Sequence, residues 1–165
     1  MSAKTAIPFV IRNFNSIEME HFVRPPLYES LGGSLTKGTA ASKLGASIDT
    51  LPPGKRGCPF HLHHAQEEMF IVLNGRGTLR IGDEERAIEE GDVICIPPGK
   101  AWPHQIINTS DQPLLYLSIS TMESPEICEY PDADKFLARV RINGKDDFRR
   151  VDFRGEGVDY WEGEK

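Results

Sequence analysis

Turn-forming residues recur at short intervals through the middle of the chain. They fall at Pro52-Pro53-Gly54, Asn74-Gly75, Gly82-Asp83, Glu90-Gly91-Asp92 and Pro97-Pro98-Gly99. Glycine and proline in such clusters mark tight turns, and most of the segments between them have the length of a strand rather than of a helix. The sequence therefore predicts an all-β fold of short strands, a barrel or a sandwich.

Apolar runs and alternating patterns mark the predicted strands. Met69 to Leu73 is an unbroken apolar run, which suits a strand buried on both faces, and Glu68, Phe70 and Val72 would share one of these faces. The other predicted strands are Ser42 to Leu51, Thr78 to Ile81, Glu85 to Ile88, Val93 to Ile96, Trp102 to Asn108 and Leu114 to Ser120.

A chain of 165 residues suits one domain with a core of its own. Residues 1–40 lack a sustained period and are predicted to form an N-terminal arm, in which Asn15 to Phe22 could make a short helix capped by Asn15. Residues 41–121 are predicted to be the barrel. Residues 122–165 have little apolar density and are predicted to be an ordered extension, packed on the barrel or on a partner.

The charge of the chain argues against two classes of partner. The net charge is −6, which gives no general attraction to nucleic acid or to an anionic membrane. Residues 134–165 look basic but contain 8 basic and 8 acidic residues. We therefore expect a small-molecule ligand, with no nucleic-acid partner and no membrane partner.

The cysteines point to a reducing compartment. Cys58, Cys95 and Cys128 are odd in number and form no C-x-x-C pair, so free thiols are expected rather than a disulfide framework. The apolar stretch Ala6 to Ile11 is interrupted by Pro8 and is too short for the core of a signal peptide. A cytoplasmic location is the resulting expectation.

Two histidines one residue apart suggest half of a metal site. Side chains alternate along a strand, so His61 and His63 would point the same way and could converge on one ion. Glu68 lies at an odd offset from His63 and would share their side only if the chain bends between His64 and Glu67. The site therefore requires a bend at that point.

A further histidine lies far along the chain, after the Pro97-Pro98-Gly99 turn. His104 would begin the next strand, with Asn108 on the same face. A His-x-His pair alone is weak evidence, whereas a distant histidine that enters a strand of the same barrel makes a metal site the better hypothesis.

These residues resemble the two motifs of the cupin superfamily, in particular its small single-domain, metal-binding members. The first motif is matched by Gly57, His61, His63, Glu68 and Gly75, and the second by Gly91, Pro97, Gly99, His104 and Asn108. Lys100 to Pro103 makes the loop before His104 two residues longer than the commonest pattern. The resemblance covers roughly residues 42–121, about half of the chain.

The resemblance implies a double-stranded β-helix, which is a jelly-roll barrel, with a divalent transition metal (Fe, Mn, Zn or Ni) held by His61, His63, Glu68 and His104. It also implies a homodimer. Glu67 and His64 would then lie beside the ligands rather than among them, because adjacent strand residues face opposite ways. Trp102 and Tyr116 could line the mouth of the pocket, although core packing explains them equally well.

The ligands alone do not select a reaction. Two open positions on an octahedral ion would suit a metal-dependent enzyme acting on a small polar molecule, of dioxygenase or sugar-isomerase type. A non-catalytic cupin that binds a small ligand through its metal is the alternative. A phosphosugar would require fixed cations, and no cluster is evident among the candidates near the motifs, which are Lys55, Arg56, Arg76, Arg80 and Lys100.

Overall fold

The structure is a computed structural model that describes residues 10–155 and 157–164. Most of the apolar stretch Ala6 to Ile11, and the start of the predicted arm, lie outside these residues. In chain order the elements are η1 (Phe14–Ser16), β1 (Glu20–Arg24), β2 (Tyr28–Ser34), β3 (Leu44–Leu51), β4 (Leu62–His63), β5 (Glu68–Asn74), β6 (Arg76–Ile81), β7 (Glu84–Glu89), β8 (Val93–Ile96), β9 (His104–Ile107), β10 (Leu114–Thr121), β11 (Glu126–Tyr130), η2 (Pro131–Ala133), β12 (Lys135–Ile142) and β13 (Lys145–Phe153).

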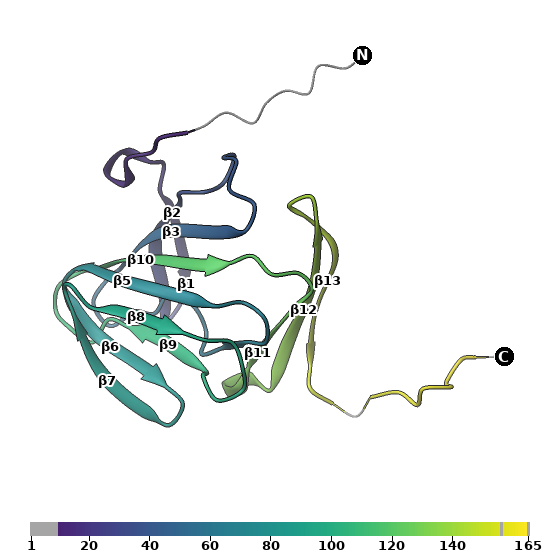
Figure 1. The fold of residues 1–165 in the computed structure, drawn as a ribbon. Helices are drawn as coiled ribbons and strands as arrows, with labels where there is room; N and C mark the ends of the chain where they lie inside the picture. Colours follow the sequence, from purple (N-terminus) through teal and green to yellow (C-terminus); the bar gives the residue numbers. More distant parts are fainter. Residues whose placement is uncertain (1–9, 156, 165) are drawn as a thin grey trace, which may run out of the picture.

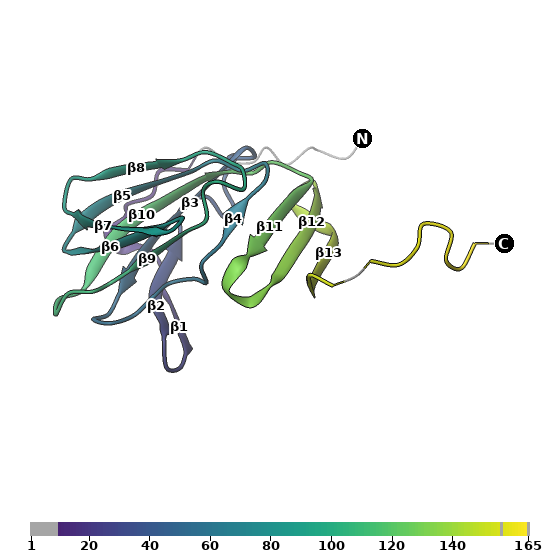
Figure 2. The same ribbon diagram turned by 90° about the horizontal axis from the view of Figure 1, so that it is seen from below.

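The strands form three sheets, and two of them make the barrel. The largest sheet has the order β1-β2-β3-β10-β5-β8, and a smaller one has the order β7-β6-β9. Figures 1 and 2 show the two sheets facing each other. Their inward side chains pack into one core, which includes Leu51 of β3, Val72 of β5, Leu79 of β6 and Leu114 of β10. The prediction of an all-β jelly-roll barrel is confirmed.

The strands predicted between residues 42 and 120 are all present, with ends that differ by a few residues. One difference lies next to the site: β9 begins at His104, as the position of this histidine predicted, so that Trp102 and Pro103 of the wider predicted strand Trp102 to Asn108 belong to the preceding loop. A second concerns β5, where burial alternates instead of extending to both faces. Phe70 and Val72 are buried, whereas Met69 and Ile71 on the other face are only half-buried. The apolar run therefore overstated how deeply this strand is buried.

The N-terminal segment adds strands where a helix was predicted. Asn13, rather than Asn15, caps a single 3-10 turn, and the residues that follow enter β1. β1 pairs with β2, and β2 pairs with β3, so this hairpin extends the large sheet. Pairing with the sheet supplies backbone hydrogen bonds that a short isolated helix would not gain, so the helix expected at Asn15 to Phe22 is wrong.

The C-terminal segment forms a third sheet, of order β13-β12-β11-β4, at one end of the barrel (Figures 1 and 2). β4 belongs to the barrel segment of the sequence, so this sheet is joined to the barrel through the pairing of Cys128 with His63. The division of the chain at residues 40 and 121 stays a prediction.

Among the described residues, no helix is long and apolar enough to cross a membrane.

The Asn74-Gly75 turn allows a prediction about stability. Gly75 has φ of +89°, and a Cβ added there would lie 2.5 Å from the carbonyl oxygen of Pro113. We expect Gly75→Ala to lower the free energy of unfolding by about 3 kcal/mol, because left-handed strain and a backbone clash act together. Gly54→Ala is the matched control, since Gly54 has φ of +75° and open space around it. Urea unfolding of both variants measures the difference, and equal losses would contradict the role of the clash.

Candidate metal centre

Four short backbone segments bring the predicted ligands to the end of the barrel at which the third sheet lies. His61 and His104 are cross-strand partners, with backbone N···O distances of 3.1 and 2.7 Å. His63 ends β4, and Glu68 begins β5 after the bend that residues 64 and 65 make in the chain. The bend required between His64 and Glu67 is therefore present, and the four side chains lie side by side.

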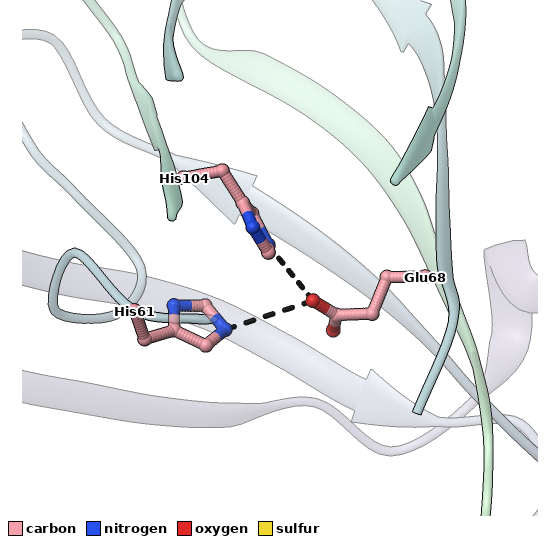
Figure 3. Close-up of side chains that lie close together, drawn as sticks. All are labelled: His61, Glu68 and His104. Carbon is pink, nitrogen blue, oxygen red and sulfur yellow. Dashed lines mark hydrogen bonds and ion pairs between the residues drawn. The ribbon is translucent and has the colours of Figure 1, made fainter. Parts of the chain in front are cut away.

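The three imidazoles surround one oxygen of Glu68. The Nε2 atoms of His104, His63 and His61 lie 2.8, 3.4 and 3.6 Å from Glu68 Oε2. Figure 3 shows the rings of His61 and His104 both directed toward this oxygen. Within the group His61, Glu68 and His104, no two donor atoms are more than 4.8 Å apart, and His63 lies beside this group through its contact with Glu68. All four side chains are largely buried, with exposed fractions of 2% to 15%.

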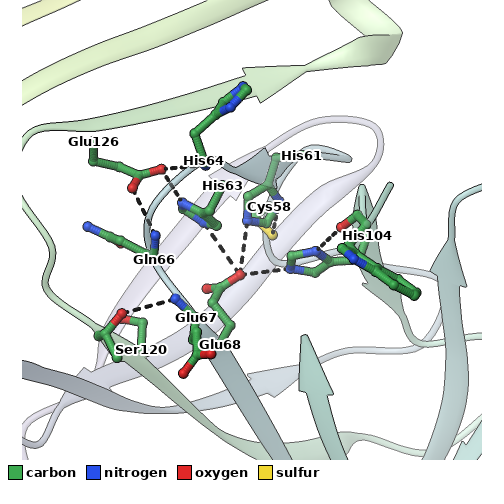
Figure 4. Close-up of polar contacts among 12 residues, drawn as sticks. Cys58, His61, His63, His64, Gln66, Glu67, Glu68, His104, Ser120 and Glu126 are labelled. Carbon is green, nitrogen blue, oxygen red and sulfur yellow. Dashed lines mark hydrogen bonds and ion pairs between the residues drawn. The ribbon is translucent and has the colours of Figure 1, made fainter. Parts of the chain in front are cut away.

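Each imidazole is oriented by an oxygen on its outer side. Nδ1 of His61 lies 2.8 Å from the carbonyl oxygen of Pro59, and Nδ1 of His104 lies 3.0 Å from that of Trp102. Nδ1 of His63 lies 3.2 Å from a carboxylate oxygen of Glu126 (Figure 4). A carbonyl oxygen only accepts, so Nδ1 carries the proton in His61 and His104, and the carboxylate favours the same tautomer in His63. In the neutral rings, all three Nε2 lone pairs then face Glu68.

Lone pairs that face a carboxylate repel it unless a positive charge lies between them. Two donors that share one ion at about 2.1 Å lie about 3.0 Å apart at a right angle and about 3.4 Å apart at the tetrahedral angle. The distances from Glu68 Oε2 to His104, His63 and His61 are 2.8, 3.4 and 3.6 Å, close to this range but not all within it. Three imidazole nitrogens and one carboxylate oxygen are also a donor set that suits Fe, Mn, Zn and Ni. The residues present therefore fit a divalent transition metal.

The electrostatics of the cluster agree with this fit. Burial alone would raise the pKa of Glu68, but the adjoining imidazoles of His104, His61 and His63 outweigh it and lower the pKa well below the ordinary range. Burial alone would lower the pKa of His61, but the nearby Cys58 and Glu68 raise it. Both shifts favour positive charge at the centre of the cluster, which a metal ion or a proton can supply.

Glu126 is a central residue that the sequence did not reveal. Its carboxylate is 4% exposed, faces Nδ1 of His63, and accepts hydrogen bonds from the backbone N–H groups of residues 64, 65 and 66 at 3.0 to 3.1 Å. It therefore fixes both the ring of His63 and the bend that leads to Glu68. No motif includes it, because it lies 63 residues from His63 in a segment of low apolar density.

The other predicted site residues lie around the cluster or away from it. His64 points away from it, and its Nε2 lies 2.6 Å from Glu129, which also pairs with Arg154 at 3.0 Å. Glu67 is tied to Thr121 through its backbone N–H, at 3.0 Å, and lines a depression on the outer face of the large sheet.

The two aromatic candidates have different surroundings. Trp102 is 42% exposed, and its carbonyl oxygen orients His104. Tyr116 is buried in the barrel core against Phe70. Neither is among the described residues that line the cavity beside the cluster, so the expected place of Trp102 and Tyr116 at the pocket mouth does not match the structure.

This cavity has a volume of about 180 Å³ and lies between the histidine-glutamate cluster and the third sheet. His61 and His63 form one wall. The C-terminal segment supplies the opposite wall, which includes Cys128, Tyr130 and Arg139. The sequence pattern gave no reason to place these three residues at the site, because only strand pairing with β4 brings them there.

Known proteins resemble the chain in sequence and in structure. The family model for the cupin domain matches residues 47–120, the segment that contains the four clustered side chains. An uncharacterised protein from Methanocaldococcus jannaschii is 33% identical over 105 residues, which are 61% of this chain and 79% of the relative. A glucose-6-phosphate isomerase from Pyrococcus horikoshii is 32% identical over 122 residues, 66% of this chain and 62% of the relative. The chain thus spans less than two thirds of that isomerase.

A solved structure extends the likeness beyond the family match. A candidate sugar phosphate isomerase from Acidithiobacillus ferrooxidans superposes with a TM-score of 0.75 at 25% identity. The superposition covers 93% of this chain and 97% of that protein, and therefore takes in the third sheet as well as the barrel.

Proposed function

The chain belongs to the cupin family, and from this premise we propose that it is a metal-dependent enzyme that acts on a small polar molecule by an isomerase-type reaction. The names of the relatives support the reaction type: one is a glucose-6-phosphate isomerase, and another is a candidate sugar phosphate isomerase. Both names refer to those proteins, and the choice of reaction for this chain is part of the proposal.

The proposed metal ligands are His61, His63, Glu68 and His104. The observation that carries this proposal is the orientation of the three rings, whose Nδ1 atoms each face an outer oxygen while their Nε2 atoms turn toward Glu68. With the Nδ1 proton directed outward, each neutral ring has its Nε2 lone pair available to bind a metal ion, which is the usual arrangement of a histidine ligand.

A metal held by these residues supplies Lewis acidity that polarises a carbonyl or hydroxyl oxygen of the substrate. The chain's own residues define where that substrate lies. Glu126 holds His63 in its ligating orientation. Cys128, Tyr130 and Leu137 close the cavity on the side opposite His61 and His63 and limit the access of water.

Elemental analysis of protein purified without a histidine tag tests the metal, and turnover tests the reaction. We expect about one transition-metal ion per chain, loss of activity after chelation, and interconversion of aldose and ketose phosphates when the metal is restored. Oxygen uptake with a substrate panel would favour a dioxygenase instead. Stabilisation by a ligand without product under any metal would favour the non-catalytic alternative.

A further inference from the structure

The wall of the cavity that faces the proposed metal centre carries a cation. Arg139 of β12 lines the cavity together with His61, His63 and Tyr130. The guanidinium of Arg139 binds Asp146 through two nitrogens, Nε at 2.6 Å and one Nη at 3.0 Å. This pairing holds the side chain in place and leaves its other Nη without a hydrogen-bond partner among the residues of 10–155 and 157–164.

A second arginine lies directly beside it in the sheet. Arg139 is the cross-strand partner of Glu126 on one side and of Arg149 on the other. Paired residues in an antiparallel sheet point to the same face, so these three side chains form one row on the face that carries Cys128 and Tyr130. Burial raises the pKa of Tyr130, and the positive charge of Arg149 acts in the opposite direction.

The positive charge on this face exceeds its local counter-charge. The carboxylate of Glu126 is already occupied by His63 and three backbone N–H groups, and Asp146 is shared by Arg139 and Arg141. In the described part of the chain, no carboxylate lies within 4.0 Å of Arg149. The same is true of Lys135, whose ammonium lies 5.1 Å from the centre of the Tyr130 ring.

A guanidinium with a free Nη beside a small cavity, next to an arginine that has no carboxylate partner in the described residues, is well suited to an oxyanion. Arginine presents planar donors that match the oxygens of phosphate and carboxylate. Asp146 already holds the guanidinium of Arg139 in place, so no further ordering of this side chain is needed when a ligand binds. We propose that Arg139 and Arg149 form an anion subsite, which binds the phosphate or carboxylate group of a small ligand whose other end reaches the proposed metal centre.

The inference that the ligand also reaches the metal rests on the proposed function, whereas the anion subsite depends only on residues of the β12-β13 hairpin. Its residues lie outside the segment matched by the family model, which ends at residue 120. The ligand is thus a small molecule with an oxyanion at one end and oxygen donors at the other, in keeping with the small volume of the cavity.

Binding of inorganic phosphate and of acetate to the full chain, kept metal-free with EDTA at fixed ionic strength, tests the subsite by calorimetry. We expect saturable binding of at least one of these anions, weakened about tenfold by Arg149→Gln and further by adding Arg139→Gln. Tighter binding of phosphate would identify a phosphate ester as the ligand class, and tighter binding of acetate a carboxylate. Arg139→Lys should retain part of the affinity, which a merely structural role would not require.

Arg150→Gln is the matched control. Arg150 adjoins Arg149 but belongs to the opposite face of the sheet, where its guanidinium binds Asp152 at 2.8 Å. Wild-type affinity in Arg149→Gln, an equal loss in Arg150→Gln, or no binding of either anion would overturn the subsite. If the protein held no metal and turned over no sugar phosphate, the proposed function would fail and phosphate binding would persist. If the subsite were wrong, metal content would remain.

Discussion

Replacing His104 with alanine is expected to lower metal affinity by at least about a hundredfold and to abolish turnover. His104 is 1% exposed, and its Nε2 makes the shortest of the three imidazole contacts with Glu68, at 2.8 Å. Its loss leaves three donors and removes the imidazole that does most to offset the burial of Glu68. Elemental analysis and a chelator competition assay measure the effect.

His21→Ala is the matched control for this experiment. His21 lies on β1, is exposed, and pairs only with Glu29 and not with the cluster. We expect its metal content to equal that of the wild type. Far-UV circular dichroism should show that His104→Ala keeps its strands, since its backbone pairing with His61 does not involve the ring. Wild-type metal occupancy in a folded His104→Ala variant would contradict the proposed ligand set.

Replacing Glu126 with glutamine is expected to reduce both stability and metal affinity. The amide keeps the shape of the side chain but offers one acceptor where the carboxylate offers two, and its NH2 group faces backbone N–H donors. We expect the metal-free protein to lose about 3 kcal/mol of unfolding free energy, because buried donors lose their partner. Metal affinity should fall about tenfold to a hundredfold, since His63 loses the group that orients it.

Glu129→Gln separates these two effects. Glu129 is also a buried carboxylate next to a histidine, but its partners are His64 and Arg154, outside the cluster. We expect this variant to lose stability and to keep the metal affinity of the wild type. Urea unfolding and metal titration of both variants provide the comparison. If Glu126→Gln lost stability but bound metal normally, Glu126 would hold the loop without orienting His63.

The parts of the site that the sequence predicted are those with a local signature. Strand periodicity placed His61 and His63 on one side, and the odd offset of Glu68 required the bend that the structure contains. His104 followed from its position after a turn at the start of a strand. In each case the information lay within a few residues of the side chain concerned.

The features that escaped prediction depend on pairing between distant segments. Glu126 reaches His63 because β11 pairs with β4, and neither strand has a pattern that names the other. The strand β1 replaced a predicted helix because an edge of the large sheet was available to it. Arg139 and Arg149 were hidden in a segment of zero net charge, where strand register sorts the cations that lie toward the cavity from those that lie away from it.

The arrangement of the third sheet separates two tasks that many enzymes combine in one set of loops. The proposed ligands belong to the segment that forms the barrel. Arg139, which lines the cavity, belongs to a hairpin that is joined to this segment through β11 and β4. Substrate preference can therefore change during evolution, or by design, through exchange of β12 and β13 while the donor atoms stay untouched. Such an exchange leaves Glu126 in place, because that residue lies on β11 and its carboxylate still faces His63.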